Sequence, residues 1–208
     1  MSLELLEKKS NENIQFINRL EFDKQYPKPI NFGEIYDKEI SSIDTAKNEF
    51  DKNKSRLKLV EEVYENYFKN IELGKDVFFN AVLPKKECIQ GMLRKLLDRL
   101  SSLLNIDQEI LHDIKLASNE AIIDFIEHEK DKENFQFKML VSNNQIQFLI
   151  GDLSLKNILP NDSYLMPDVE SERGRGIPMM AEYSDKVEAR RDKEGKNYAF
   201  LLIKNLGN

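Results

Sequence analysis

A strand followed at once by a strongly amphipathic helix constrains the fold more than any other feature of the sequence. Val77–Leu83 is rich in β-branched and aromatic residues, and Pro84 after it predicts that the strand ends there. One broad apolar face on the next helix predicts a packed domain that contains both helices and strands. That face repeats apolar residues at steps of three and four, at Ile89, Met92, Leu93, Leu96, Leu97, Leu100, Leu103 and Leu104.

The rest of the sequence after Asp76 predicts an α+β domain. Asp107 is placed as the N-cap of a second long helix. The stretch 153–173 has no periodicity, and an irregular segment of this length is more often a lid or binding loop than a simple connector. The further expected elements are a helix from about Gln108 to Glu129, a hairpin of Phe135–Val141 and Gln145–Ile150, a helix from about Gly176 to Ser184, and a closing hairpin of Lys186–Arg191 and Tyr198–Lys204.

Residues 1–75 differ in character and predict a helical extension ahead of a domain formed by residues 76–208. Asn13 to Phe22 favours one short helix. From Tyr36 to Tyr67 apolar residues recur with a heptad-like spacing, which predicts a long amphipathic helix, although Lys47 and Lys54 occupy two of the apolar positions. Two interpretations remain open: a coiled-coil or docking helix that supports self-association, and a helix that lies on its own domain.

Composition excludes several classes of protein. The net charge of −6 argues against broad binding to nucleic-acid backbones, which needs clustered positive charge. A single cysteine, Cys88, excludes an internal disulfide and is interpreted as a small apolar residue in a reducing compartment. The charged start and the absence of a long apolar run predict a soluble, cytoplasmic protein without a membrane span.

Two short motifs carry chemistry. Glu120 and Asp124 are four residues apart, so they share one helix face, where Mg²⁺ would offset the repulsion between the two carboxylates. Ala117 and Ala121 beside them are expected to leave room for a bulky ligand. Gly174-Arg175-Gly176 stands before an apolar run, where a helix start and flexible glycines let backbone N–H groups approach an anion. The alternatives are a solvated acidic face and a flexible turn. His128, one turn after Asp124, is interpreted as a helix-end histidine rather than a zinc ligand.

The order of these motifs resembles that of the GHKL (Bergerat-fold) ATPases, and within them most closely the bacterial anti-sigma-factor serine kinases of partner-switching pathways. The resemblance covers about Asp76 to Leu206 and rests on ASNEAIIDFIEH at 117–128 and ERGRGIPMMAEYSDKVEARRD at 172–192. It implies a two-layer α/β sandwich, with a mixed sheet and helices on one face.

The resemblance also implies roles for single residues. Glu120 matches the glutamate that acts as, or positions, the base, and Asp124 stands where the family has an asparagine that holds Mg²⁺. Asp152 matches the aspartate that binds the adenine amino group, and Gly174, Arg175 and Gly176 match the second glycine box around the triphosphate. The first glycine box is degenerate, since Ser154 and Lys156 replace its glycines, and Asn197 replaces a common threonine.

Two functions follow as expectations. The first is an ATP- and Mg²⁺-dependent serine/threonine kinase of the anti-sigma-factor type that phosphorylates a STAS-type antagonist and so regulates a partner-switching pathway. The second is a non-catalytic module of the same fold that acts by protein–protein binding only. Both imply a protein partner of STAS or sigma-factor type, with self-association as a further expectation, and neither implies nucleic acid or a membrane.

Overall fold

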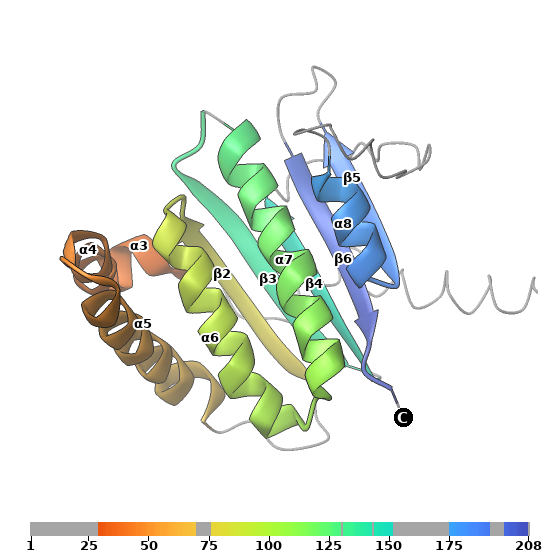
Figure 1. The fold of residues 1–208 in the computed structure, drawn as a ribbon, viewed down its shortest axis with the longest axis horizontal. Helices are drawn as coiled ribbons and strands as arrows, with labels where there is room; N and C mark the ends of the chain where they lie inside the picture. The colour runs from red at the N-terminus through yellow and green to blue at the C-terminus, as the bar shows by residue number, and fades with distance from the viewer. Residues whose placement is uncertain are drawn as a thin grey trace, which may run out of the picture.

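The computed structural model describes residues 29–69, 76–129, 131–142, 144–151, 175–191 and 198–207. Within these residues a six-stranded sheet is covered on one face by helices (Figure 1). The expected helix at Asn13 to Phe22 and the expected loop at 153–173 lie outside the described residues.

The sheet is mixed. Its strands run in the order β1-β2-β3-β4-β6-β5, with β1 parallel to β2 and every other neighbouring pair antiparallel. One row of paired residues, Phe79, Met139, Phe148 and Leu202, crosses the sheet from β2 to β6. The strands are β1 Ile30–Asn31, β2 Val77–Pro84, β3 Asn134–Ser142, β4 Gln145–Gly151, β5 Lys186–Arg191 and β6 Tyr198–Asn205.

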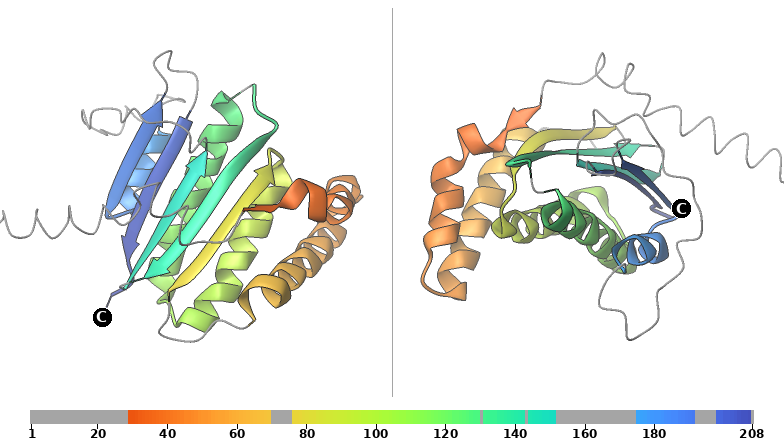
Figure 2. Two further views of the ribbon diagram at one scale, coloured as in Figure 1. Left: turned by 180° about the vertical axis from the view of Figure 1, so that it is seen from behind. Right: turned by 90° about the horizontal axis from the view of Figure 1, so that it is seen from above.

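Three helices form the second layer: α6 (Glu87–Leu104), α7 (Gln108–His128) and α8 (Gly176–Tyr183). The view from above in Figure 2 shows them on the same side of the sheet. Their apolar faces and one face of the sheet share a single buried core. The predicted α+β two-layer sandwich, with a mixed sheet and helices on one face, is therefore confirmed.

Aromatic rings make up much of the core between the layers. Phe137 of β3 has its ring centroid 6.2 Å from that of Phe79 and 5.7 Å from that of Phe148. The ring centroid of Phe125 in α7 lies 5.4 Å from that of Phe135 in β3. Ring contacts therefore hold the helix that carries the acidic motif against the sheet. Cys88 is buried, and its burial raises the pKa of the thiol to about 12, which matches the interpretation of a small apolar residue.

The expectation of one long helix between Tyr36 and Tyr67 is wrong. The chain forms α3 (Phe32–Ile35), α4 (Asp37–Thr45), α5 (Glu49–Val63) and the π-helical turn η2 (Tyr64–Phe68). Ala46 is extended, and the Asn48 side chain accepts a hydrogen bond from the Asp51 backbone N–H at 2.9 Å, which starts a new helix. The break turns α5 back along α4.

The apolar stripe of this segment is therefore divided between two environments. Ile40, Ile43 and Val60 are buried in the same core as the sheet, whereas Phe50 and Leu57 are exposed on α5. Figure 1 shows α4 and α5 beside α6, at the β1–β2 edge of the sheet. Of the two interpretations, a segment that packs on its own domain is the one that this arrangement matches. None of the described helices is long and apolar enough to cross a membrane.

Candidate functional site

Helix α7 is the central element of the candidate site. It begins where the Asp107 side chain accepts a hydrogen bond from the Glu109 backbone N–H at 2.8 Å, which confirms the predicted N-cap, and it ends at His128. Ala117 and Ala121 were expected to leave room for a bulky ligand beside the acidic pair. That expectation is wrong, because both are buried in the hydrophobic core and the space beside them is filled by packing.

Glu120 lies on α7 next to this buried face and is half-buried. Burial raises the pKa of its carboxyl above the ordinary value, and the negative charges of Asp124 and then Glu127 raise it further. Each effect disfavours the ionised form. A carboxylate with a raised pKa is a stronger base than an ordinary glutamate, so the position suits a group that takes or orients a proton.

Asp124 lies one turn further along α7 and faces the first residue of α8. A Cβ placed on Gly176 would lie only 3.3 Å from the Asp124 Oδ1 atom. This is tighter than most van der Waals contacts, so the absence of a side chain at Gly176 allows the backbone of α8 to approach the carboxylate. The acidic motif and the second glycine motif, far apart in sequence, are thus brought together.

The N-terminus of α8, with its first backbone N–H groups, lies beside the Asp124 carboxylate. Arg175 is the N-cap residue, it is exposed, and its side chain makes no capping hydrogen bond. The first N–H groups of a helix have no acceptor within the helix, and together with the helix dipole they favour an anion. The Met179 backbone N–H already bonds to the Arg175 carbonyl at 2.9 Å, so the helix is regular from its first turn.

His128 occupies the last position of α7, as interpreted from the sequence. Its Nε2 atom lies 3.8 Å from the Asp124 Oδ1 atom, and the side chain is 54% exposed. Within the described parts of the chain no group of three or more His, Cys, Asp and Glu side chains could hold a metal ion. Mg²⁺ does not require such a group, since it is often held by one or two carboxylates together with substrate phosphates and water.

The donor set fits Mg²⁺ and a nucleotide phosphate. Asp124 offers carboxylate oxygens, and the α8 N-terminus beside it offers backbone N–H groups. Of the predicted site residues, Glu120, Asp124, Arg175 and Gly176 share this region of the structure. The other two, Asp152 and Gly174, lie outside the described residues; β4 ends at Gly151, which has a φ of 117°.

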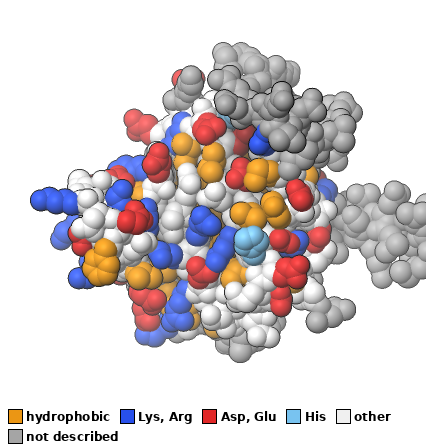
Figure 3. Space-filling view, viewed as in Figure 1, with side chains coloured by type: hydrophobic (Ala, Val, Ile, Leu, Met, Phe, Trp, Pro, Cys, Tyr) orange, Lys and Arg blue, Asp and Glu red, His pale blue; other side chains and the backbone are white. Residues whose placement is uncertain are grey.

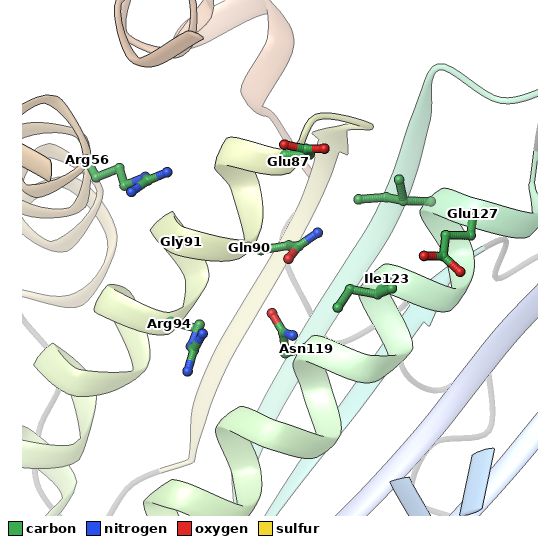
Figure 4. Close-up of a pocket in the computed structure, with 9 residues that line it drawn as sticks. Arg56, Glu87, Gln90, Gly91, Arg94, Asn119, Ile123 and Glu127 are labelled. Carbon is green, nitrogen blue, oxygen red and sulfur yellow. The ribbon is translucent and has the colours of Figure 1, made fainter. Parts of the chain in front are cut away.

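Sequence reasoning missed a second group of polar residues, on the face of α7 that neighbours the acidic pair. Gln90 and Arg94 of α6 and Asn119 of α7 line a cavity between the two helices (Figure 4). Gly91 in the middle of α6 was the available signal. Glycine is unfavourable inside a helix, so its presence there indicates a close approach by another group.

The fold and the region around Glu120 and Asp124 together define an ATPase-type domain of the GHKL class. A family model described as the histidine kinase-like ATPase domain matches residues 86–199, and the chain belongs to that family. A search of curated protein sequences found no significant match.

Among solved structures, the RsbU and RsbW domains of Rv1364c from Mycobacterium tuberculosis are similar to this chain, with 10% sequence identity and a TM-score of 0.47. The similarity covers 63% of this chain and 33% of that one. The chain thus spans about a third of the length of that relative.

Proposed function

We propose that the protein is a cytoplasmic, ATP-dependent serine/threonine kinase of the anti-sigma-factor type, whose substrate is a STAS-type antagonist protein. One observation carries the proposal: the carboxylate of Asp124, one turn from the half-buried Glu120, lies against Gly176 at the start of α8. Membership of the histidine kinase-like ATPase family supports nucleotide binding at this place.

Each residue has a separate task in this proposal. Glu120 takes or orients the proton of the attacking hydroxyl. Asp124 holds Mg²⁺, which when bound neutralises charge on the transferring phosphoryl group. The first backbone N–H groups of α8 bind phosphate oxygens. Gly176 has no side chain, so these N–H groups can lie close to the Asp124 carboxylate that holds Mg²⁺.

The reaction transfers one phosphoryl group. The substrate serine oxygen forms a bond to the γ-phosphorus, the bond between that phosphorus and the bridging oxygen breaks, and ADP leaves. The hydroxyl proton passes to the Glu120 carboxylate. The raised pKa of Glu120 supports this role, because burial makes its carboxylate a better proton acceptor than an exposed glutamate.

The second candidate function is a non-catalytic module that acts by protein–protein binding. It is favoured by Ser154 and Lys156, which stand where the resemblance implies glycines, and by Asp124, whose charge opposes nucleotide phosphates when Mg²⁺ is absent. Both functions include a partner of STAS or sigma-factor type and allow self-association.

Calorimetry and thermal unfolding with Mg²⁺-ATP separate the two functions. A ligand that binds only the folded state stabilises it by about 2.7 kcal/mol at one hundred times its dissociation constant, so the midpoint must rise if the site is functional. Incubation with a STAS-domain protein and labelled ATP then tests transfer to serine. If millimolar ATP gives no heat of binding and does not raise the midpoint of thermal unfolding, the kinase proposal is wrong and the binding module takes its place.

A further inference from the structure

A polar groove lies between α6 and α7, with α5 forming part of its outer wall. The cavity has a volume of about 530 Å³. Figure 4 shows side chains of both helices lining it, with Gln90 and Arg94 on one wall and Asn119 and Ile123 on the other. Because Asn119 and Ile123 each directly precede a residue of the acidic pair, the groove lies on the face of α7 next to the candidate nucleotide site, about 100° around the helix.

The polar side chains around this groove are not used by the rest of the described chain. The side chains of Glu87, Gln90, Arg94, Asn119 and Glu127 form no hydrogen bond or ion pair with any residue that the structure describes. The Asn119 Oδ1 atom is shielded from solvent and still accepts no hydrogen bond. Shielded polar atoms in native proteins are nearly always bonded, so the Asn119 oxygen has an unused hydrogen-bonding capacity, while the Glu87, Arg94 and Glu127 side chains are exposed and available to a partner.

Arg56 and Gly91 show that the outer wall is built from two helices. The Arg56 side chain extends from α5 across α6, and a Cβ on Gly91 would lie 2.8 Å from its Nε atom. The guanidinium is held by Glu49, whose Oε1 atom is 2.6 Å from Nη1. A glycine at this position in α6 is therefore what allows a cation from α5 to reach the groove.

Apart from Arg56, which is paired with Glu49, the charges in the groove are ordered along its length. Glu87, in the first turn of α6, and Glu127, near the end of α7, lie at the same end (Figure 4). Arg94 follows Glu87 by two helical turns, which is about 10 Å along the axis. Ile123 and Ile126 supply partly buried apolar surface between the two charged positions.

From this arrangement we propose that the groove docks an amphipathic helix of a partner protein. The helix carries a basic residue opposite Glu87 and Glu127, an acidic residue about two turns away opposite Arg94, and an apolar residue between them facing Ile123. The inference goes beyond the proposed kinase function and does not depend on it, because none of these residues is assigned a task in nucleotide binding or phosphoryl transfer, although the charge of Glu127 acts on the neighbouring Glu120.

A helix fits this surface better than a small molecule does. Small-molecule pockets are mostly apolar and enclose their ligand, whereas this groove carries exposed charges of both signs along its rim. Two neighbouring helices also offer the kind of groove into which the side chains of a third helix pack. The surrounding face has both signs interspersed rather than one large basic patch, so the charge order within the groove is what would select a partner (Figure 3).

The test uses three stapled helical peptides of about 15 residues, which is about four turns. The first has lysine, leucine and glutamate at the proposed spacing, the second has lysine at both charged positions, and the third has glutamate at both. Binding to the full chain is measured by fluorescence anisotropy, and the contact surface by amide shifts of the ¹⁵N-labelled protein. Nucleotide is left out, so failure here and failure of the kinase proposal are distinguishable.

The mixed-charge peptide is expected to bind about fivefold more tightly than either like-charged peptide, with shifts at Gln90, Arg94 and Asn119. In Arg94→Glu both ends of the groove are acidic, so the two-lysine peptide should bind best. Lys95→Glu makes the same charge change at the next residue, which does not line the groove. In this control the mixed-charge peptide should still bind most tightly. Equal affinities, shifts confined to other surfaces, no binding, or an unchanged order in Arg94→Glu would each overturn the proposal.

Discussion

Replacing Gly91 with alanine tests the packing that builds the groove wall. A Cβ at this position would lie 2.8 Å from Nε, 3.1 Å from Cζ and 3.2 Å from Cδ of Arg56. Carbon atoms do not approach other heavy atoms so closely, so the guanidinium has to move away. Because it is the far end of a flexible side chain, we expect the protein to fold and the Arg56 contacts to be lost.

Two opposing effects set the change in the free energy of unfolding that Gly91→Ala causes. Alanine inside a helix is more favourable than glycine by about 1 kcal/mol. Against this, moving Arg56 breaks its ion pair with Glu49, which is worth about 0 to 1 kcal/mol because the Glu49 side chain is 66% exposed. The packing of the Arg56 stem is weakened as well. The free energy of unfolding of Gly91→Ala should therefore stay within about 0.5 kcal/mol of the parent.

A double-mutant cycle with Arg56→Ala separates the two effects. Without the guanidinium the alanine meets no obstacle, so in that background Gly91→Ala should stabilise the protein by about 1 kcal/mol. Urea unfolding followed by circular dichroism on the four proteins gives the coupling energy, which we expect to be about 0.5 to 1.5 kcal/mol. If Gly91→Ala stabilises both backgrounds equally, Arg56 does not lie over Gly91 and the description of the groove wall is wrong.

Four further predictions, on three variants, concern the candidate nucleotide site. Glu120→Gln should leave Mg²⁺-ATP affinity within a few-fold while phosphoryl transfer falls by about 10²- to 10⁴-fold; parental transfer rates would remove Glu120 from catalysis. The same variant should be more stable than the parent at neutral pH, because folding raises the pKa of Glu120 and the ionised form is therefore disfavoured in the folded state. That difference should shrink as the pH falls through the pKa of Glu120 and vanish below about 4, where both states are protonated, and urea titrations at several pH values measure it. For Asp124→Asn we expect ATP binding to depend less on Mg²⁺ than in the parent, since a neutral amide does not repel the phosphates. Calorimetry with and without EDTA measures this dependence. An equal loss of ATP affinity in both proteins on adding EDTA would contradict the prediction. Asp152→Ala should weaken binding by about 10- to 150-fold, the equivalent of a charge-assisted hydrogen bond of roughly 1.5 to 3 kcal/mol, and an unchanged dissociation constant would rule out its role with adenine.

Much of the fold could be predicted because its signals are local. The strand at Val77, the hairpin formed by β3 and β4 and the helix after Asp107 each depend on residues within a few positions of one another. The long helix expected from Tyr36 failed for a related reason. A heptad-like pattern records which residues face the core, and two helices packed against that core preserve the pattern as well as one helix does.

The site was predicted less completely than the fold. The acidic pair could be read from its spacing on one helix, but the role assigned to Ala117 and Ala121 could not, because a small residue beside a charged one suits either a ligand or a close contact with the sheet. The groove between α6 and α7 had only Gly91 as a signal. A glycine indicates a close approach without saying which residue approaches.

Local sequence patterns were enough to predict the order of the elements after Asp76, the N-cap of α7, and the shared face of Glu120 and Asp124. Backbone periodicity and capping fix such features within a single turn or strand. The three-dimensional fold was needed to show that Gly176 lies against Asp124, that α5 packs beside α6, and that Arg56 reaches a groove between two other helices. These are distances between separate elements, and they depend on how whole side-chain surfaces fill the space between layers, which no local pattern specifies.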